Sequence, residues 1–182
     1  MDAIKRIFAV ILVLLLLAIT VFCVYFKVPS LRLAKMIESE SIGDLSLTIY
    51  YMKPSILTFL PVTVDALIDW HEDQRIIIYC NDLEEHIDLF KQISNKDMKP
   101  KWNKTPYKNI RLYYLLESEK NGKLFDVAMW GYDESMYVNG IEVMGGEIFY
   151  DVIIPFMPED VIKDWEDSGI IGNGKSVEGS HQ

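Results

Sequence analysis

Residues 110–143 read IRLYYLLESEKNGKLFDVAMWGYDESMYVNGIEV, and this stretch decides the fold. Residues 110–117 and 123–131 have the composition of strands, and Asn121-Gly122 lies between them. A second pair, Asn139-Gly140, separates two further short apolar runs. Asn-Gly is the preferred sequence of a two-residue type I′ hairpin turn, because both positions of that turn need positive φ angles. The stretch therefore predicts an antiparallel meander.

Before the meander, strands and helices are expected to alternate. Residues 44–52 alternate apolar and polar side chains, which predicts a half-buried strand. Thr63 is an expected N-cap for a helix over residues 64–70. Residues 75–80 are apolar enough to predict a strand covered on both faces, and Asn81 is expected to cap a helix that continues to about residue 94.

After the meander the pattern becomes helical again. Residues 147–154 fit either a strand or a helix, and their apolar stripe suits the helix. Pro158 is expected at the first position of a last helix ending near Asp167. This order predicts one α+β domain over residues 44–168, an antiparallel sheet with helices packed on one face. Residues 169–182 are rich in Gly, Ser and Asn, and we expect a disordered tail.

Residues 7–26 read IFAVILVLLLLAITVFCVYF, with no charge, proline or glycine. A helix of this length covers about 30 Å, the thickness of the hydrocarbon core of a bilayer. Lys5 and Arg6 precede the run, and its bulky end lacks the small residues of a cleavage site. We therefore expect residues 1–26 to be an uncleaved signal anchor with one transmembrane helix, joined to the domain by a connector over residues 27–43.

The predicted location is the cell membrane, with the lipid bilayer as the partner of residues 7–26. Only a short segment precedes the apolar run, whereas a whole domain follows it. We therefore expect the N-terminus inside and the domain outside. Secretion after cleavage of the leader is the alternative.

The charge balance narrows the choice of partners. The chain carries a net charge of −9; residues 1–26 carry +1, so the remainder carries −10. An acidic domain of this kind predicts that nucleic acid is not a partner. Cys23 lies in the expected anchor and Cys80 in the domain, so we expect no disulfide within the chain.

Residue patterns that would indicate catalysis are absent from the sequence. The chain contains no phosphate-binding glycine loop, nucleophile elbow or dinucleotide-binding fingerprint. His71 and His86 have no second histidine at metal-binding spacing, and the acidic residues near the C-terminus do not follow a calcium-loop pattern. We therefore expect no catalytic residue, no metal and no cofactor.

One basic segment stands out in this acidic chain. Residues 96–111 carry a net charge of +5, with two aromatic side chains interleaved. A basic loop with aromatic residues could contact an anionic envelope polymer, a lipid headgroup or an acidic protein; the alternative is a solvated loop. The candidate binding residues are Lys96, Lys99, Lys101, Trp102, Lys104, Tyr107, Lys108 and Arg111.

Four segments, DLSLTIYYMKPSILTFLPVTVDALI, NGKLFDVAMWG, MYVNGIEV and FYDVIIPFMPED, resemble short exported or membrane-tethered proteins of Gram-positive anaerobes. The resemblance spans most of residues 43–166 and implies no catalytic residues. Together with the anchor it leads to the hypothesis of a non-enzymatic, membrane-tethered extracytoplasmic domain that binds a protein or envelope component. The alternatives are an immunity-like or inhibitory protein acting at the membrane, and a hydrolase with an unrecognised site.

Overall fold

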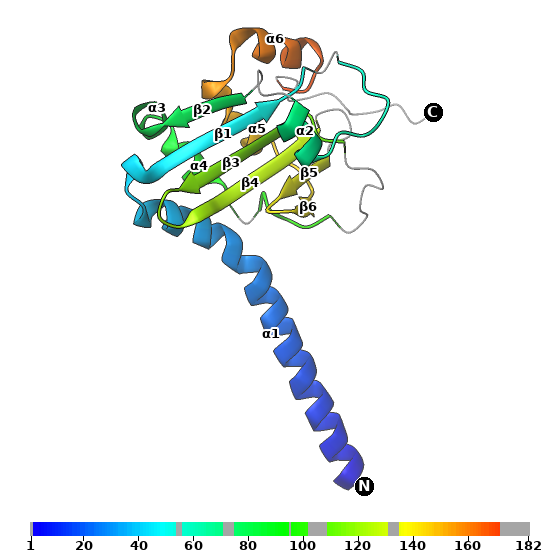
Figure 1. Cartoon of the computed structure of the whole chain (residues 1–182). Coiled ribbons are helices and arrows are strands. Elements are labelled where there is room, and N and C mark those ends of the chain that lie inside the picture. Colours follow the sequence, from blue (N-terminus) through cyan, green and yellow to red (C-terminus); the bar gives the residue numbers. More distant parts are fainter. Residues whose placement is uncertain are drawn as a thin grey trace.

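A six-stranded antiparallel sheet forms the centre of the protein (Figure 1). The computed structural model describes residues 2–53, 56–70, 75–94, 96–101, 109–130 and 135–171. The strand order is β2-β1-β3-β4-β5-β6, and every neighbouring pair is antiparallel. The α+β class and the meander are therefore confirmed. The strands are β1 (Leu45–Tyr51), β2 (Arg75–Tyr79), β3 (Leu112–Ser118), β4 (Gly122–Trp130), β5 (Ser135–Val138) and β6 (Ile141–Val143).

The two Asn-Gly pairs form different turns. Asn139 (φ 48°) and Gly140 (φ 77°) both have positive φ, so the predicted type I′ turn between β5 and β6 is confirmed. In the other hairpin only Gly122 has positive φ (69°), and Ser118 pairs with Gly122 across a three-residue loop. The hydroxyl of Ser118 accepts hydrogen bonds from the backbone N–H groups of Lys120 (3.2 Å) and Asn121 (3.3 Å). The prediction of a type I′ turn there was wrong, because the Ser118 side chain favours a longer loop.

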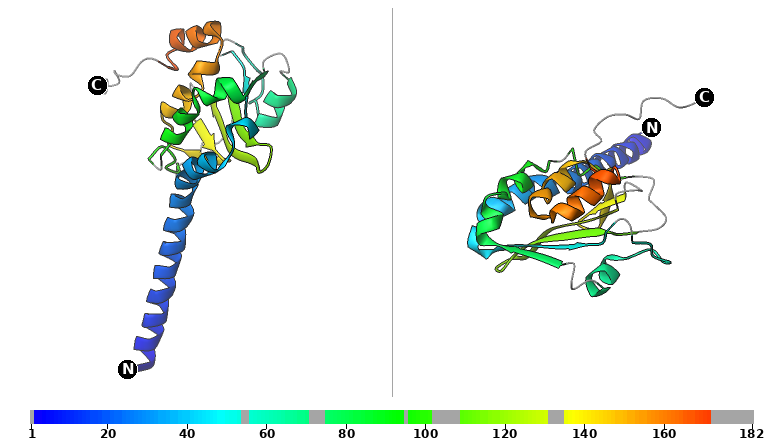
Figure 2. Two further views of the ribbon diagram at one scale, coloured as in Figure 1. Left: turned by 90° about the vertical axis from the view of Figure 1, so that its left-hand side faces the viewer. Right: turned by 90° about the horizontal axis from the view of Figure 1, so that it is seen from above.

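Helices cover both faces of the sheet, whereas the sequence predicted one. On one face lie the end of α1 (Asp2–Ser39) and α4 to α6, while α2 lies on the opposite face (Figure 2). The apolar residues on that second face form a smaller buried cluster, and α2 shields this cluster from solvent. The helices after α1 are η1 (Ile42–Asp44), α2 (Val64–Trp70), α3 (Cys80–Glu84), α4 (Ile87–Gln92), α5 (Ile148–Asp151), η3 (Ile154–Phe156) and α6 (Glu159–Asp167).

The main core contains a line of four aromatic rings between the sheet and its larger helical layer. Phe90 of α4 packs against Tyr114 of β3, Tyr114 against Phe125 of β4, and Phe125 against Phe149 of α5. Successive ring centroids are 6.4, 6.4 and 6.5 Å apart, and all four side chains are buried. These contacts fix α4 and α5 against β3 and β4.

Two details of the predicted order differ in the structure. β2 is an edge strand with Ile77 and Tyr79 exposed, so the prediction of a strand covered on both faces was wrong. The expected helix over residues 81–94 is two helices, α3 and α4, separated by a turn at Glu85 and His86, and Tyr79 rather than Asn81 is the N-cap of α3. The predicted cap at Thr63 is confirmed, because its Oγ1 accepts a 3.1 Å hydrogen bond from the N–H of Ala66.

The last helices largely follow the prediction. α5 lies within residues 147–154, where the apolar stripe suited a helix, and η3 begins at the last residue of that range. α6 ends at Asp167 as expected, with Pro158 as its N-cap instead of its first helical residue. Most of the predicted tail, residues 172–182, lies outside the described residues, as does His71.

The N-terminal helix α1 is longer than the sequence predicted. Its backbone is helical from Asp2 through Pro29 to Ser39, so most of the expected connector continues the helix that contains residues 7–26. Leu33 and Ile37 are buried in the main core, whereas the N-terminal part of α1 projects away from the domain (Figure 1). Within the part of the chain that the structure describes, no helix combines the length and the apolar character that a membrane crossing requires.

Candidate functional site

The predicted basic residues do not gather on one surface in the described structure. Lys96 and Lys99 are exposed, Lys101 is half-buried, and Arg111 is buried. Trp102, Lys104, Tyr107 and Lys108 lie outside the described residues.

The residues around Lys101 extend the sheet beyond β6. Pro100 forms an antiparallel bridge with Val143, and the backbone N–H of Lys101 donates a 2.9 Å hydrogen bond to the carbonyl of Glu142. The ammonium of Lys101 also lies 3.6 Å from the buried carboxylate of Glu142. This part of the basic segment therefore protects a sheet edge.

Arg111 points inward. Its guanidinium donates a 3.0 Å hydrogen bond to the hydroxyl of Thr58 and contacts the sulfur of Met52. Burial lowers the pKa of Arg111 from its ordinary value. The side chain joins the start of β3 to residues 56–61, the segment between β1 and α2, which we call the strap.

The strap carries exposed apolar side chains. Leu57 is 95% exposed, Phe59 is fully exposed and Leu60 is 78% exposed. Val62, which directly follows the strap, anchors it to the domain. The Val62 side chain is buried, its N–H donates a hydrogen bond to Asn109 Oδ1 (3.0 Å), and its carbonyl accepts one from the N–H of Ile110 (2.7 Å). Apolar side chains presented on an anchored segment are typical of a surface that contacts a partner.

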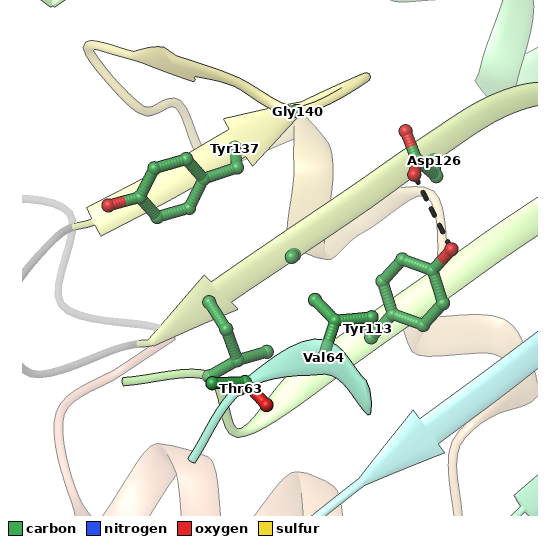
Figure 3. Close-up of a pocket in the computed structure, with 8 residues that line it drawn as sticks. Thr63, Val64, Tyr113, Asp126, Tyr137 and Gly140 are labelled. Carbon is green, nitrogen blue, oxygen red and sulfur yellow. Dashed lines mark hydrogen bonds between the residues drawn. The ribbon is translucent and has the colours of Figure 1, made fainter. Parts of the chain in front are cut away.

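A pocket of about 310 Å³ lies next to the strap, between α2 and the sheet (Figure 3). Its floor is Ala128 of β4, which pairs with Tyr113 of β3 on one side and Tyr137 of β5 on the other. The small side chain between two tyrosines leaves the space empty. The residues that line the pocket are Thr63, Val64, Ile110, Tyr113, Asp126, Ala128, Tyr137 and Gly140.

One end of the pocket is polar. The hydroxyl of Tyr113 donates to Asp126 Oδ2 at 3.4 Å, and the ammonium of Lys123 lies 3.1 Å from the same oxygen. The type I′ turn holds Asp126 in place, because the N–H of Asp126 donates to Asn139 Oδ1 (3.0 Å) and the N–H of Asn139 donates to the carbonyl of Asp126 (2.9 Å).

The polar end of the pocket presents a protonated phenol as a hydrogen-bond donor. Burial, followed by the nearby charge of Asp126, raises the pKa of Tyr113 well above its ordinary value, so its phenol stays protonated at neutral pH. A phenol in that state donates a hydrogen bond and does not act as a base or nucleophile. Among the described residues, no group of three His, Cys, Asp or Glu side chains could hold a metal ion.

Sequence reasoning did not single out these pocket residues. The available signal was Asp126, a residue type depleted in strands, placed inside the run LFDVAMW. Its significance depends on Tyr113 and Tyr137, which reach the same place only through strand pairing. No protein-family model matches the chain, and no match is found among curated proteins or solved structures.

Proposed function

We propose that this protein is a membrane-tethered, non-enzymatic binding domain. Residues 7–26 lie in the cell membrane, the N-terminus is inside, and the domain faces outward. The ligand binds at the end of the domain that carries the strap and the pocket.

The tether is supported by the sequence of residues 7–26 together with the exposure of their side chains. The structure describes the side chains of Phe8 and of residues 10–21 in this run. The large apolar side chains between Val10 and Val21 are each 49–62% exposed on a helix that stands away from the domain (Figure 1). Leaving a leucine in water instead of an apolar environment costs about 1.5–3 kcal/mol, so insertion into lipid would stabilise this segment strongly.

The arrangement at the two ends of β1 carries the proposal. The end of α1 and η1 lead into β1 at Leu45, and the strap follows β1 after Tyr51. A strand of this length spans roughly 23 Å at about 3.3 Å per residue. The tether and the strap with its neighbouring pocket therefore lie at opposite ends of the sheet, so that a tethered domain presents the pocket away from the lipid.

A second candidate, an inhibitor of a basic protein at the membrane, is favoured by the surface of α6. This helix carries five acidic residues and one lysine, and most of these side chains are exposed. Such a surface attracts cationic proteins and repels anionic lipid headgroups. Recovery of a basic protein with the full-length chain from membranes, lost when α6 acids are changed to lysine but retained in Ala128→Leu, would favour this candidate over pocket binding.

The tether is tested by the double variant Leu15→Lys, Leu16→Lys. Each lysine at the centre of a transmembrane helix costs about 2.5–3.5 kcal/mol on insertion scales. We expect the native chain to remain in membranes after alkaline carbonate extraction and the double variant to be released. Leu57→Lys, Phe59→Lys is the matched control, because it adds two lysines at exposed apolar strap positions and should stay with the membrane.

Orientation is tested on intact cells with externally added protease. Loss of the domain supports the proposal, whereas full protection contradicts the outward placement. Release of the native chain by carbonate would contradict the tether itself.

A further inference from the structure

We infer that the pocket beneath α2 binds a small molecule in which an apolar ring is joined to a protonated amine. This inference rests on the proposed function, in that it takes the pocket as the binding site. It adds the chemical class of the ligand.

The walls of the pocket select an apolar body. Val64, Ile110 and Ala128 contribute only aliphatic surface, and the rings of Tyr113 and Tyr137 flank Ala128 (Figure 3). The volume of about 310 Å³ lies at the lower end of the range for small-molecule sites, which suits one ring and a short chain. Tyr113 is held in place by stacking on Tyr50, with ring centroids 6.0 Å apart.

The polar end of the pocket selects a hydrogen-bond donor. Oδ2 of Asp126 accepts a hydrogen bond from the Tyr113 hydroxyl and forms an ion pair with Lys123. Oδ1 of Asp126 is buried and has no hydrogen-bond partner among the described residues. A buried carboxylate oxygen without a donor is costly, and a ligand that supplies the donor removes that cost. An ammonium group does so with three N–H donors and a positive charge.

The charges around this end favour a cation over an anion. Glu117 is the register partner of Lys123 on the neighbouring strand, and the carboxylate of Asp126 lies 3.1 Å from the ammonium of the same lysine, so two acidic residues neighbour one basic residue. Both carboxylates also raise the pKa of Tyr113, which places their negative potential at the pocket. This negative potential and the net charge of −9 would repel a carboxylate ligand. The same charges attract a protonated amine, and the faces of the tyrosine rings attract it as well.

The test uses the full-length chain in nanodiscs of neutral lipid and three probes of one shape. Phenethylamine carries the amine, 2-phenylethanol replaces it with a hydroxyl, and 3-phenylpropionate carries a carboxylate. Binding is followed by the amide NMR signals of Ala128 and Gly140, with empty nanodiscs as the control for partition into lipid. We expect phenethylamine to bind at least about 10-fold more tightly than 2-phenylethanol and 3-phenylpropionate to bind weakest, since charge-assisted bonds are the stronger ones.

Two variants assign the binding to the pocket. Asp126→Asn should weaken phenethylamine about 10-fold and 2-phenylethanol much less, because the variant removes the negative charge and keeps one acceptor oxygen. Ala128→Leu fills the floor and should abolish both, with the thermal unfolding midpoint measured to show that the variant folds.

The outcomes separate the inference from the proposed function. Equal binding of the amine and the alcohol, both lost in Ala128→Leu, overturns the ligand class and leaves the pocket as the binding site. Tighter binding of 3-phenylpropionate overturns it as well. If none of the three probes shifts the amide NMR signals of Ala128 and Gly140, the inference is overturned. The carbonate extraction and protease experiments then test the membrane tether separately.

Discussion

The hydroxyl of Ser118, at the end of β3, donates a 2.6 Å hydrogen bond to the carboxylate of Glu40, which directly follows α1. The side-chain amide of Asn121 donates to the other oxygen of Glu40. One carboxylate therefore joins the N-terminal helix to the β3–β4 hairpin. Together with buried Leu33 and Ile37, this contact fixes where α1 meets the sheet.

The first prediction concerns pH. The hydrogen bonds from Ser118 and Asn121 lower the pKa of Glu40, so the folded state favours the ionised carboxylate more than the unfolded state does. The resulting stabilisation is fully present above the unfolded pKa of about 4.3 and is lost as the pH falls through the lower folded value. We expect Glu40→Gln to lower the unfolding midpoint at pH 7 and to have less effect at low pH. A pH-independent difference would contradict this role.

Tyr114 provides a test of the buried hydrogen bond in the main core. Its hydroxyl donates a 3.0 Å bond to the carbonyl of Phe149, and the side chain is fully buried. Tyr114→Phe keeps the ring but leaves that carbonyl without its donor, so we expect a loss of about 1–2 kcal/mol in the free energy of unfolding. Tyr79→Phe, at an exposed position, should change it by less than about 0.5 kcal/mol. Urea denaturation measures both, and equal effects would disprove the importance of the bond.

Gly140 tests the backbone of the type I′ turn. Its φ is +77°, and a Cβ added there would meet nothing within 4 Å, so the cost of alanine is conformational and not steric. We expect Gly140→Ala to lower the free energy of unfolding by about 1–2 kcal/mol. Gly146→Ala is the matched control, because Gly146 lacks a positive φ and its Cβ would make ordinary contacts at 3.8 Å and 4.0 Å. Similar unfolding curves for the two variants would refute the prediction.

Lys101 and Glu142 test the covered sheet edge. Lys101→Met removes an ammonium 3.6 Å from a carboxylate that is 3% exposed, so we expect a loss of about 1–2 kcal/mol, less than for a fully buried pair because Lys101 is 31% exposed. Replacing Glu142 with Leu in the same chain should recover much of this loss, since no buried charge is then left. Lys99→Met, at an exposed position, should have little effect. A larger loss in the double variant than in Lys101→Met would contradict this explanation.

The sequence predicted the features that depend on local backbone chemistry. Asn139-Gly140 and the cap at Thr63 form as expected because each acts within four residues. The Asn121-Gly122 turn differs because the Ser118 hydroxyl accepts hydrogen bonds from the backbone N–H groups of Lys120 and Asn121, an equally local contact that the Asn-Gly pattern by itself does not reveal.

Longer-range features were beyond the sequence patterns. The apolar run of β2 suits a covered strand and an edge strand equally, and its place is decided by β1 pairing with β3 on its other side. The pocket depends on three residues in neighbouring strands, Tyr113, Ala128 and Tyr137, none of which carries a motif. The basic segment was visible from charge alone, but charge does not show that Arg111 turns inward.

The proline inside α1 has a mechanical consequence. Pro29 lies between the exposed apolar turns and buried Leu33, and it cannot donate to the carbonyl of Tyr25. A helix that lacks one of its backbone hydrogen bonds bends most easily at that point. We therefore expect α1 to bend at Pro29, so that the tilt of the domain relative to the N-terminal part of α1 depends on the stiffness of this single turn.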